Sequence, residues 1–413
     1  MGTKSNLSIS PTILKYYLYK STKAVEFYRP IMYLYFLSQG LSFTQVVILE
    51  AAYNLTTLLG EVPTGYVSDR FGRRPSLLIG SVLITTTLIA IGFANSFREL
   101  LVLFVTWSMG YNFRSGSEDA WLYDSLTDLD RSDHFPHVRG RGEALALAIG
   151  AGASVIGGYV GGIDLAYPFF LAAGVMAVGV GVVYTMPEPR SYRRATTDRL
   201  RFRESVNVIK RTLGTRRIRA FVLYYFVLFA AVLYVTSIFL QPVFETAVLE
   251  LGASPSAVEP LLGWFYAIVS LVSAGLSYHT GRIYESIGVK GWFATVPFLV
   301  GTGLVVLWFV PVLAIPVLLG ARSVVETSRS LAIQHVNIHV GTIGRASVLS
   351  AMAMVSSVTV IPFQLGSGVI SDLASPLIAL SLAGVTLVAG SAALLALSSP
   401  LRSDDAVAKI SSD

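Results

Sequence analysis

The chain contains no cysteine among its 413 residues, which excludes disulfide bonds, thiolate metal sites and cysteine nucleophiles. Charged residues are also scarce, at 14% of the chain, whereas a soluble globular protein carries about 25%. Apolar residues make up 53%, and the mean hydropathy is +0.63. So few charges do not cover a water-facing surface. The composition therefore argues against a soluble enzyme and against a nucleic-acid-binding protein.

Motifs of nucleotide chemistry and hydrolysis are absent as well. The chain contains no G-x-x-x-x-G-K-[ST], G-x-G-x-x-G, H-E-x-x-H or G-x-S-x-G string. We therefore expect neither an enzyme nor an ATP-driven pump, and we predict no cofactor and no metal site. An ion gradient is then the remaining energy source for any transport by this chain.

Hydrophobic runs of membrane-spanning length recur along the whole sequence. A helix rises 1.5 Å per residue, so roughly 20 apolar residues cross the ~30 Å hydrocarbon core of a bilayer. A membrane barrel would instead alternate apolar and polar residues along ~10-residue segments. We predict an all-α membrane protein with twelve transmembrane helices, near 16–39, 44–66, 76–95, 100–123, 142–162, 166–186, 219–241, 258–280, 292–310, 313–335, 346–371 and 375–397.

Lysine and arginine are distributed very unevenly around these predicted spans. Of the 31 basic residues, only Arg98 lies in a loop predicted to be outside. Because cytoplasmic loops of membrane proteins carry the excess of Lys and Arg, we expect a multi-pass cell-membrane protein with both termini in the cytoplasm. The formal charge of +6 then reflects topology and contact with the anionic lipid of the bilayer, not a nucleic-acid partner.

The two halves of the chain repeat the same short strings. Residues 65–74 read GYVSDRFGRR and residues 281–290 read GRIYESIGVK, and R-S-x-x-E occurs at Arg114–Glu118 and again at Arg322–Glu326. Such a repeat predicts two pseudo-symmetric six-helix bundles with a site between them near the middle of the membrane. We predict an N-terminal bundle at 1–186, a polar, basic cytoplasmic linker at 187–218, and a C-terminal bundle with a short cytoplasmic tail at 219–413.

The 65–74 string resembles the signature loop of the major facilitator superfamily, G-x-x-x-D-R-x-G-R-R between the second and third spans. The resemblance implies that Asp69 caps the start of span 11 near 344–346, and that Arg73 pairs with Asp124. It implies a conformational gate, for which a purely topogenic basic turn is the alternative. The gate residues would be Gly65, Asp69, Arg70, Gly72, Arg73, Arg74, Asp124, Gly281, Glu285 and Gly288.

The fifth predicted span is rich in glycine. Its pattern resembles the antiporter motif of the same superfamily, G-x-x-x-x-G-P-x-x-G-G, with Gly158 in place of the proline. The resemblance points to drug or small-molecule:proton antiporter-like members, whereas ordinary close packing of small residues is the alternative. The residues concerned are Gly152, Gly157, Gly158, Gly161 and Gly162.

Charged residues inside the predicted spans are the candidate substrate and proton sites, because a charge at mid-bilayer is costly and such residues are functional candidates by default. Lys20 is expected to extend toward the cytoplasmic interface, and Arg114 and Arg322 are expected to reach acids on other helices such as Glu26. Glu118 is the first candidate for the proton carrier, and a set of neutralised pairs that only fixes helix packing is the alternative. The candidates are Glu26, Arg29, Arg114, Glu118, Asp119, Arg322, Glu326 and Arg329.

These features together predict a secondary active transporter that works by alternating access. We expect proton-coupled efflux of a small polar or amphipathic molecule by a monomer. Proton-coupled uptake of an organic anion is the alternative, and a sensor or scaffold that does not transport is the alternative from another class of protein.

Overall fold

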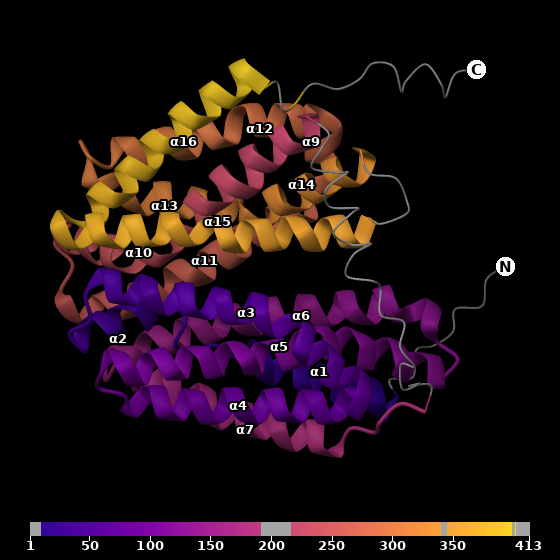
Figure 1. Cartoon of the computed structure of the whole chain (residues 1–413). Helices are drawn as coiled ribbons and strands as arrows, with labels where there is room; N and C mark the ends of the chain where they lie inside the picture. Colours follow the sequence, from indigo (N-terminus) through magenta and orange to yellow (C-terminus); the bar gives the residue numbers. More distant parts are fainter. Residues whose placement is uncertain (1–9, 191–215, 340–344, 399–400, 402–413) are drawn as a thin grey trace, which may run out of the picture. The chain divides into compact units, whose positions relative to one another are not determined.

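The structure, a computed structural model, describes residues 10–190, 216–339, 345–398 and 401 (Figure 1). Every regular element in these ranges is a helix. Nine of the helical segments described there are long and apolar enough to cross a membrane. The predicted all-helical, multi-pass membrane architecture is therefore confirmed.

Three of the predicted spans are not among these nine, and the buried charged side chains of the described residues lie in them. The first span is divided between α1 (Pro11–Ala24) and α2 (Met32–Ser38). The other two lie in the long helices α3 (Phe43–Phe71) and α5 (Phe97–Asp128). Glu50 of α3 and both Arg114 and Glu118 of α5 are buried. The candidates Arg322, Glu326 and Arg329, by contrast, lie in one of the nine segments, Pro311–Ile338.

The described helices belong to two compact units. Unit 1 comprises Met1–Leu41, Leu49–Thr197 and Ser254–Ile268, and unit 2 comprises Ser42–Ile48, Asp198–Ala253 and Val269–Asp413. The first turns of α3 therefore belong to unit 2, and the first half of α11 (Val258–Tyr278) belongs to unit 1. The boundaries 1–186, 187–218 and 219–413 stay a prediction.

Unit 1 is completed by α4 (Arg73–Phe93), α6 (Phe135–Gly161) and α7 (Tyr167–Thr185). Helix α4 packs against α5 and α7, and α1 packs against α6 and α7 (Figure 1). Helix α5 begins at a side-chain cap, in which the Ser96 hydroxyl accepts from Glu99 N and the Glu99 carboxylate accepts from Asn95 N at 3.0 Å. The hydrogen bond from the Asn95 backbone lowers the pKa of Glu99.

The break between α1 and α2 lies near the middle of the first predicted span. Residues 25–31 form turns, in which Arg29 N donates to Glu26 O and Ile31 N donates to Tyr28 O. Pro30 has no backbone N–H and disfavours a helical conformation in the residue before it, so a continuous helix is interrupted here. Glu26 and Arg29 are therefore presented on a non-helical segment between two half-helices.

Unit 2 is also helical throughout its described residues. Its seventh predicted span contains a π-helical stretch, Val222–Phe229, which is rare and frequently marks functional sites. The tenth predicted span is divided at Val324. The helices of this part of the chain are α9 (Arg216–Phe221), α10 (Ala230–Glu250), α12 (Thr280–Val306), α13 (Ala314–Ser323), α14 (Val325–His339), α15 (Arg345–Leu373) and α16 (Pro376–Ser398).

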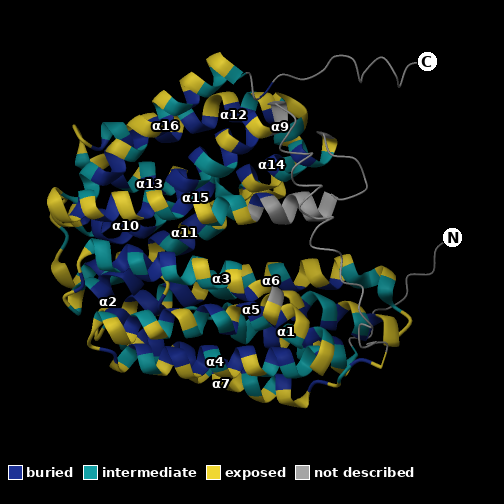
Figure 2. Cartoon of the chain, in the orientation of Figure 1, coloured by how far each residue is buried: buried dark blue, intermediate teal, exposed yellow. Residues whose placement is uncertain are grey.

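Large apolar side chains are exposed on the helices of both units, and they are among the yellow segments of Figure 2. Leu59 and Val102 of unit 1 are 66% and 65% exposed, and Leu271 and Leu299 of unit 2 are 67% and 71% exposed. Contiguous exposed apolar surface is unfavourable in water but is required against lipid. These faces fit the hydrocarbon region of a bilayer.

Candidate functional site

A buried ion cluster in unit 1 surrounds Glu118. Lys20 Nζ of α1 lies 2.6 Å from Glu118 Oε1 of α5, and Lys23 Nζ pairs with Glu118 Oε2. Lys20 Nζ also lies 2.8 Å from Glu143 Oε1 of α6. The side chains of Lys20 and Glu118 are only 8% and 5% exposed. Lys20 is therefore buried between two carboxylates, one of which is exposed, and its expected extension toward the cytoplasmic interface stays a prediction.

Two aromatic residues of α1 adjoin this cluster. Arg114 Nε donates to the Tyr19 hydroxyl at 3.0 Å, and its guanidinium carbon lies 5.5 Å from the centre of the Tyr19 ring. The expected reach of Arg114 to Glu26 is thus replaced by a contact with Tyr19. The hydroxyl of Tyr16 is buried and has no hydrogen-bond partner within the described part of the chain. The Tyr16 ring lies against Gly142, where an added Cβ would lie 2.8 Å from it.

The other candidate charges of unit 1 are more exposed. Glu26 Oε2 accepts from Arg29 Nε at 2.7 Å, and the two side chains are 33% and 53% exposed. Asp119 Oδ1 accepts from Arg139 Nε at 2.9 Å, and both of these side chains are about half exposed. An exposed ion pair in the middle of a predicted span does not tolerate hydrocarbon. The Glu26–Arg29 pair therefore indicates a water-accessible face.

Aromatic side chains lie close to that pair. Tyr53 of α3 makes an edge contact with Trp107 and a tilted contact with Tyr111, both of α5, with ring centres 5.9 and 6.4 Å apart. Tyr53 also interacts electrostatically with both Glu26 and Arg29. Tyr111 is 43% exposed. The water-accessible face therefore combines charge with aromatic surface.

In unit 2 the three candidate charges lie on α13 and α14. Arg322 is half-buried, and its Nε is buried without a hydrogen-bond partner in the described ranges. Glu326 and Arg329 are exposed and lie within electrostatic range of Tyr225 in the π-helical stretch. In each unit, ionisable side chains thus lie next to the point where the helix of a predicted span is interrupted.

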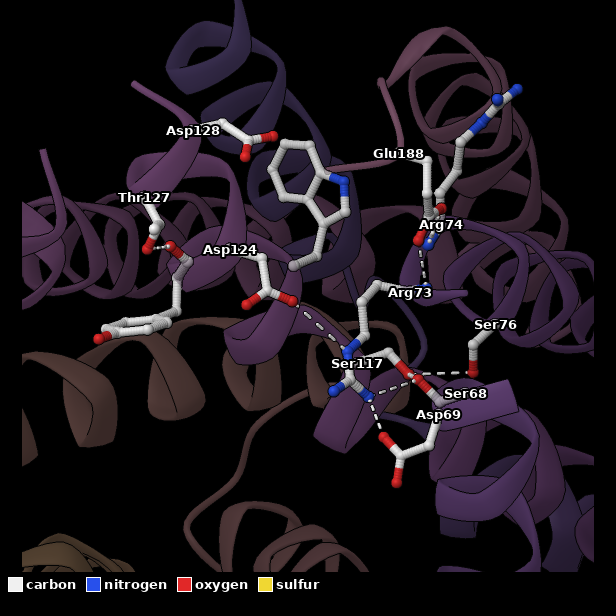
Figure 3. A network of polar contacts seen from close by, with 12 residues as sticks. Ser68, Asp69, Arg73, Arg74, Ser76, Ser117, Asp124, Thr127, Asp128 and Glu188 are labelled. Carbon is white, nitrogen blue, oxygen red and sulfur yellow. Dashed lines mark hydrogen bonds and ion pairs between the residues drawn. The ribbon is translucent and has the colours of Figure 1, made fainter. Parts of the chain in front are cut away.

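The signature loop forms a polar network at the junction of α3 and α4 (Figure 3). Arg73 Nη1 donates to Asp69 Oδ1 at 2.6 Å and to Ser68 Oγ at 3.2 Å. Arg73 Nε lies 3.7 Å from Asp124 Oδ2, which is the ion pair expected from the sequence. Residue 344, the predicted neighbour of Asp69 at span 11, lies outside the described residues.

The network also contains a residue that the sequence did not single out. Glu188 caps the start of α4: its Oε1 accepts from Arg73 N at 2.7 Å and its Oε2 accepts from Arg74 N at 2.9 Å. A carboxylate at a helix N-terminus satisfies free N–H groups and opposes the positive end of the helix dipole. Pro187 O accepts from Trp121 Nε1, so residues 187 and 188 are bound to unit 1.

Gly72 and Gly288, matched in the repeat, share an unusual backbone conformation. Gly72 has φ 116° and ψ 158°, and Gly288 has φ 64° and ψ 178°. This region of φ/ψ space is essentially restricted to glycine. An added Cβ would lie 2.8 Å from Glu188 Oε1 at Gly72, whereas it would meet nothing within 4 Å at Gly288, Gly65 or Gly281. The repeat is therefore visible in the backbone.

The remaining gate candidates lie at the surface of their units. Arg70 Nη1 donates to the Tyr66 hydroxyl at 2.8 Å, and Arg74 Nη2 donates to Tyr184 O at 2.5 Å. Glu285 is exposed. These positions fit a loop at a helix end, and their role in a gate stays a prediction.

Two of the five glycines of the antiporter-like pattern, which lie in α6 and at its C-cap, are required by packing. A Cβ at Gly157 would collide with Phe27 O, in the break of span 1, and a Cβ at Gly158 would collide with Glu259 O of α11. A Cβ at Gly161 would lie 3.3 Å from the side chain of Ile31. A Cβ at Gly152 would meet no atom within 4 Å, and a Cβ at Gly162 would make only ordinary contacts. Close approach of a neighbouring backbone is therefore enough to explain why glycine stands at positions 157 and 158, and an antiporter function is not needed to explain it.

Several contacts join residues that no local pattern connects. Lys20 and Glu118 are 98 positions apart, and Arg73 and Glu188 are 115 apart. In unit 2, Asp372 accepts from Phe43 N at 2.7 Å and from Thr44 N at 2.9 Å. Within the described residues no group of three or more His, Asp or Glu is arranged to hold a metal ion.

Comparison with known proteins identifies the family. The family model described as Major Facilitator Superfamily matches residues 22–344. The chain therefore belongs to the Major Facilitator Superfamily, as the signature loop predicted. The superfamily consists of membrane transporters, not enzymes.

A curated relative is the uncharacterized MFS-type transporter YxaM of Bacillus subtilis (strain 168), which is 24% identical over 148 residues. That match covers 36% of this chain and 36% of the relative. The matching region thus spans well under half of the relative.

Solved structures share the fold over nearly the whole chain. A mutant of the nucleoside transporter NupG has a TM-score of 0.78 at 14% identity, covering 93% of this chain and 98% of that one. A POT family transporter in complex with 5-aminolevulinic acid has a TM-score of 0.67 at 14% identity, covering 95% and 96%. The D-xylose-proton symporter has 0.62 at 12%, covering 93% and 95%. At these identities the likeness shows the fold alone.

Proposed function

We propose that this chain is a secondary active transporter that works by alternating access and couples transport to protons through Glu118. The observation that carries the proposal is a carboxylate inside a predicted span, 5% exposed and held by two lysines. Apolar side chains often stabilise a fold at least as well as a buried ion cluster. The presence of a buried ion cluster inside a membrane protein, where apolar side chains would stabilise the fold as well, supports a functional role for Glu118.

Coupling follows from competition for one carboxylate. Protonation of Glu118 removes the negative charge that Lys20 and Lys23 share, so a proton and these two ammonium groups exclude one another. Residues 25–31, which directly follow α1, are not helical and allow α1 to move relative to α2. A proton that binds one conformation better than the other shifts the equilibrium between them.

The substrate is proposed to be a small polar or amphipathic molecule. In unit 1, the Glu26–Arg29 pair and the rings of Tyr53, Trp107 and Tyr111 offer charge and aromatic surface together. In unit 2, Arg322, Glu326 and Arg329 are the matching candidates. Efflux is the proposed direction, after the antiporter-like pattern of the fifth span. Uptake of an organic anion is the alternative, and the printed name of one neighbour, the D-xylose-proton symporter, favours uptake.

The topology completes the proposal. We place the chain in the plasma membrane as a monomer with both termini in the cytoplasm, because the basic residues avoid the predicted outer loops. The signature-loop network of Asp69, Arg73 and Asp124 is proposed to act as the inner gate.

The test measures conformation and needs no substrate. Because the chain has no native cysteine, spin labels attach only at introduced positions, here Asn95→Cys in unit 1 and Ala374→Cys in unit 2, both exposed. Electron–electron double resonance in nanodiscs gives the distance distribution at pH 6 and pH 8. One proton per molecule changes the free-energy difference between two states by up to ~2.7 kcal/mol over two pH units, roughly a 100-fold change in their ratio.

We expect the distribution to shift with pH in the parent chain and to be the same at both pH values in Glu118→Gln. Asp119→Asn is the matched control, since it neutralises the adjacent, half-exposed acid, and it should keep the pH response. A pH response that survives Glu118→Gln would refute Glu118 as the carrier. In proteoliposomes, the sign of proton flux that accompanies a transported compound then separates efflux from uptake.

A further inference from the structure

Lys20 bridges two carboxylates that differ in their access to water. Its Nζ lies 2.6 Å from Glu118 Oε1 and 2.8 Å from Glu143 Oε1. The Glu118 side chain is 5% exposed, whereas the Glu143 side chain is 44% exposed. The three groups come from α5, α1 and α6. A continuous line of hydrogen-bonded polar atoms therefore leads from the buried acid to an accessible one.

Glu143 lies at the predicted inner end of the fifth span, which begins near residue 142. Its neighbour Gly142 makes room for the ring of Tyr16, whose buried hydroxyl has no hydrogen-bond partner in the part of the chain described. Tyr16 interacts electrostatically with Glu118 and Glu143. An accessible acid at this end and an orphaned buried hydroxyl beside the cluster fit a pathway for protons better than a sealed packing contact.

We propose that Glu143 is the inner port of a proton relay, and that Lys20 passes the proton between Glu118 and Glu143. The proposal rests on the proposed function, in which Glu118 carries the proton. In the release direction an N–H bond of Lys20 breaks and an O–H bond forms on Glu143. Protonated Glu118 then returns a proton to the neutral amine, and Glu143 gives its proton to water. One proton leaves Glu118, and Lys20 ends as it began.

Other charged groups around the relay are accounted for by contacts of their own. Lys23 of α1 pairs with Glu118, and Arg114 of α5 donates to Tyr19. Arg139 of α6 pairs with Asp119 of α5 and interacts electrostatically with Glu143. These groups tune the relay. Lys23 is 29% exposed but pairs with no second carboxylate in the described part of the chain, so it offers no further acid to which the proton passes. Glu143 is the acid that shares Lys20 with Glu118, so the relay is specific to it.

The experiment separates the rate of proton transfer from its equilibrium. Donor and acceptor dyes at Asn95→Cys and Ala374→Cys report the relaxation of full-length protein in nanodiscs after a jump from pH 6 to pH 8, with the proton itself as the probe. A positioned acid or base accelerates proton transfer by typically 10²–10⁴-fold. We expect Glu143→Gln to reach the same end states as the parent but at least ~10-fold more slowly, and Glu143→Asp to restore much of the rate.

Lys20→Arg provides the second variant. Arginine keeps the positive charge between the two acids but is not deprotonated in proteins, so the ion cluster is preserved and the relay is interrupted. It should slow relaxation as Glu143→Gln does. Asp133→Asn, which neutralises an exposed acid of unit 1 outside the cluster, should relax like the parent. Folding of each variant is checked by size-exclusion chromatography.

The outcomes distinguish the two proposals. If Glu118→Gln abolishes the pH response while Glu143→Gln and Lys20→Arg relax at the parent rate, the relay is refuted and the carrier stands. If Glu118→Gln keeps the pH response, the carrier assignment and the relay both fail. Slowing in Glu143→Gln and Lys20→Arg with unchanged end states supports the relay, since a merely structural role would alter the end states.

Discussion

Replacement of Gly72 by alanine tests whether the two glycines of the repeat serve the same backbone purpose. Both Gly72 and Gly288 adopt a conformation that L-residues avoid, which costs of order 1–3 kcal/mol for a residue with a side chain. Gly288→Ala should lose this amount alone, because an added Cβ meets no atom within 4 Å. Gly72→Ala should lose more, because the Cβ displaces the Glu188 carboxylate from the start of α4.

The additional loss follows from the cap that Glu188 forms. A side-chain cap at a helix N-terminus contributes about 0.5–2 kcal/mol, and Glu188 accepts from two N–H groups at 2.7 and 2.9 Å. Gly72→Ala is therefore expected to lose ~1.5–5 kcal/mol. Once the cap is displaced, removing Glu188 changes little more. The double variant Gly72→Ala/Glu188→Ala should then unfold with the free energy of Gly72→Ala.

The assay is thermal unfolding of the purified variants in one detergent, followed by intrinsic tryptophan fluorescence. The expected order of midpoints is parent, then Gly288→Ala, then Gly72→Ala together with the double variant. Glu285→Ala is the control, since it removes an exposed acid at a matched position of the repeat. Equal midpoints for Gly72→Ala and Gly288→Ala, or additive losses in the double variant, would show that Glu188 does not cap α4.

Three further outcomes follow from contacts within the units. Lys20→Met should lower the midpoint of thermal unfolding more than Lys23→Met. Removing one partner of a buried pair costs ~3–5 kcal/mol, and Lys20 is 8% exposed whereas Lys23 is 29% exposed. Equal losses in the two variants would contradict this difference in burial. Gly157→Ala should reduce the yield of monodisperse protein on size-exclusion chromatography, whereas Gly152→Ala should not, because only the first meets a backbone oxygen; a loss in both would indicate a role beyond packing. Asp372→Ala should lower the free energy of unfolding by ~1 kcal/mol, because it leaves two N–H groups at the start of α3 without their acceptor. Asp372→Asn should lower it less. No change in either variant would show that Asp372 does not stabilise the start of α3.

The fold was predictable because span length and hydropathy are local properties of the chain. Twenty apolar residues in a row span a bilayer wherever they occur, and helices were found where the runs predicted them. The signature loop was equally readable: Gly72 and Gly288 carry the repeat in their backbone conformation, and Arg73 lies beside Asp124 as the loop predicts. The family followed from the same local string.

The partners of the charged residues were not predictable in the same way. The sequence indicated that a charge on Glu118 is costly in a membrane. It did not indicate that the compensating lysines lie on α1, or that Glu143, at the start of the fifth span, shares Lys20 with Glu118. Arg114 was expected at Glu26 and instead contacts Tyr19. Hydropathy predicts that a buried charge needs compensation, but it carries no information on which helix supplies it.

The sequence by itself determined that this is a multi-pass helical membrane protein of the Major Facilitator Superfamily. A helix crosses the hydrocarbon region when a single stretch of chain is long and apolar enough, and that property is local to the stretch. Tertiary structure alone decided that Lys20 lies between Glu118 and Glu143, and that Glu188 caps α4. It also decided that Gly157 and Gly158 of α6 lie too close to a backbone oxygen to accept a side chain. Those choices depend on how helices pack side by side, and packing brings together residues that are about 100 positions apart in the chain.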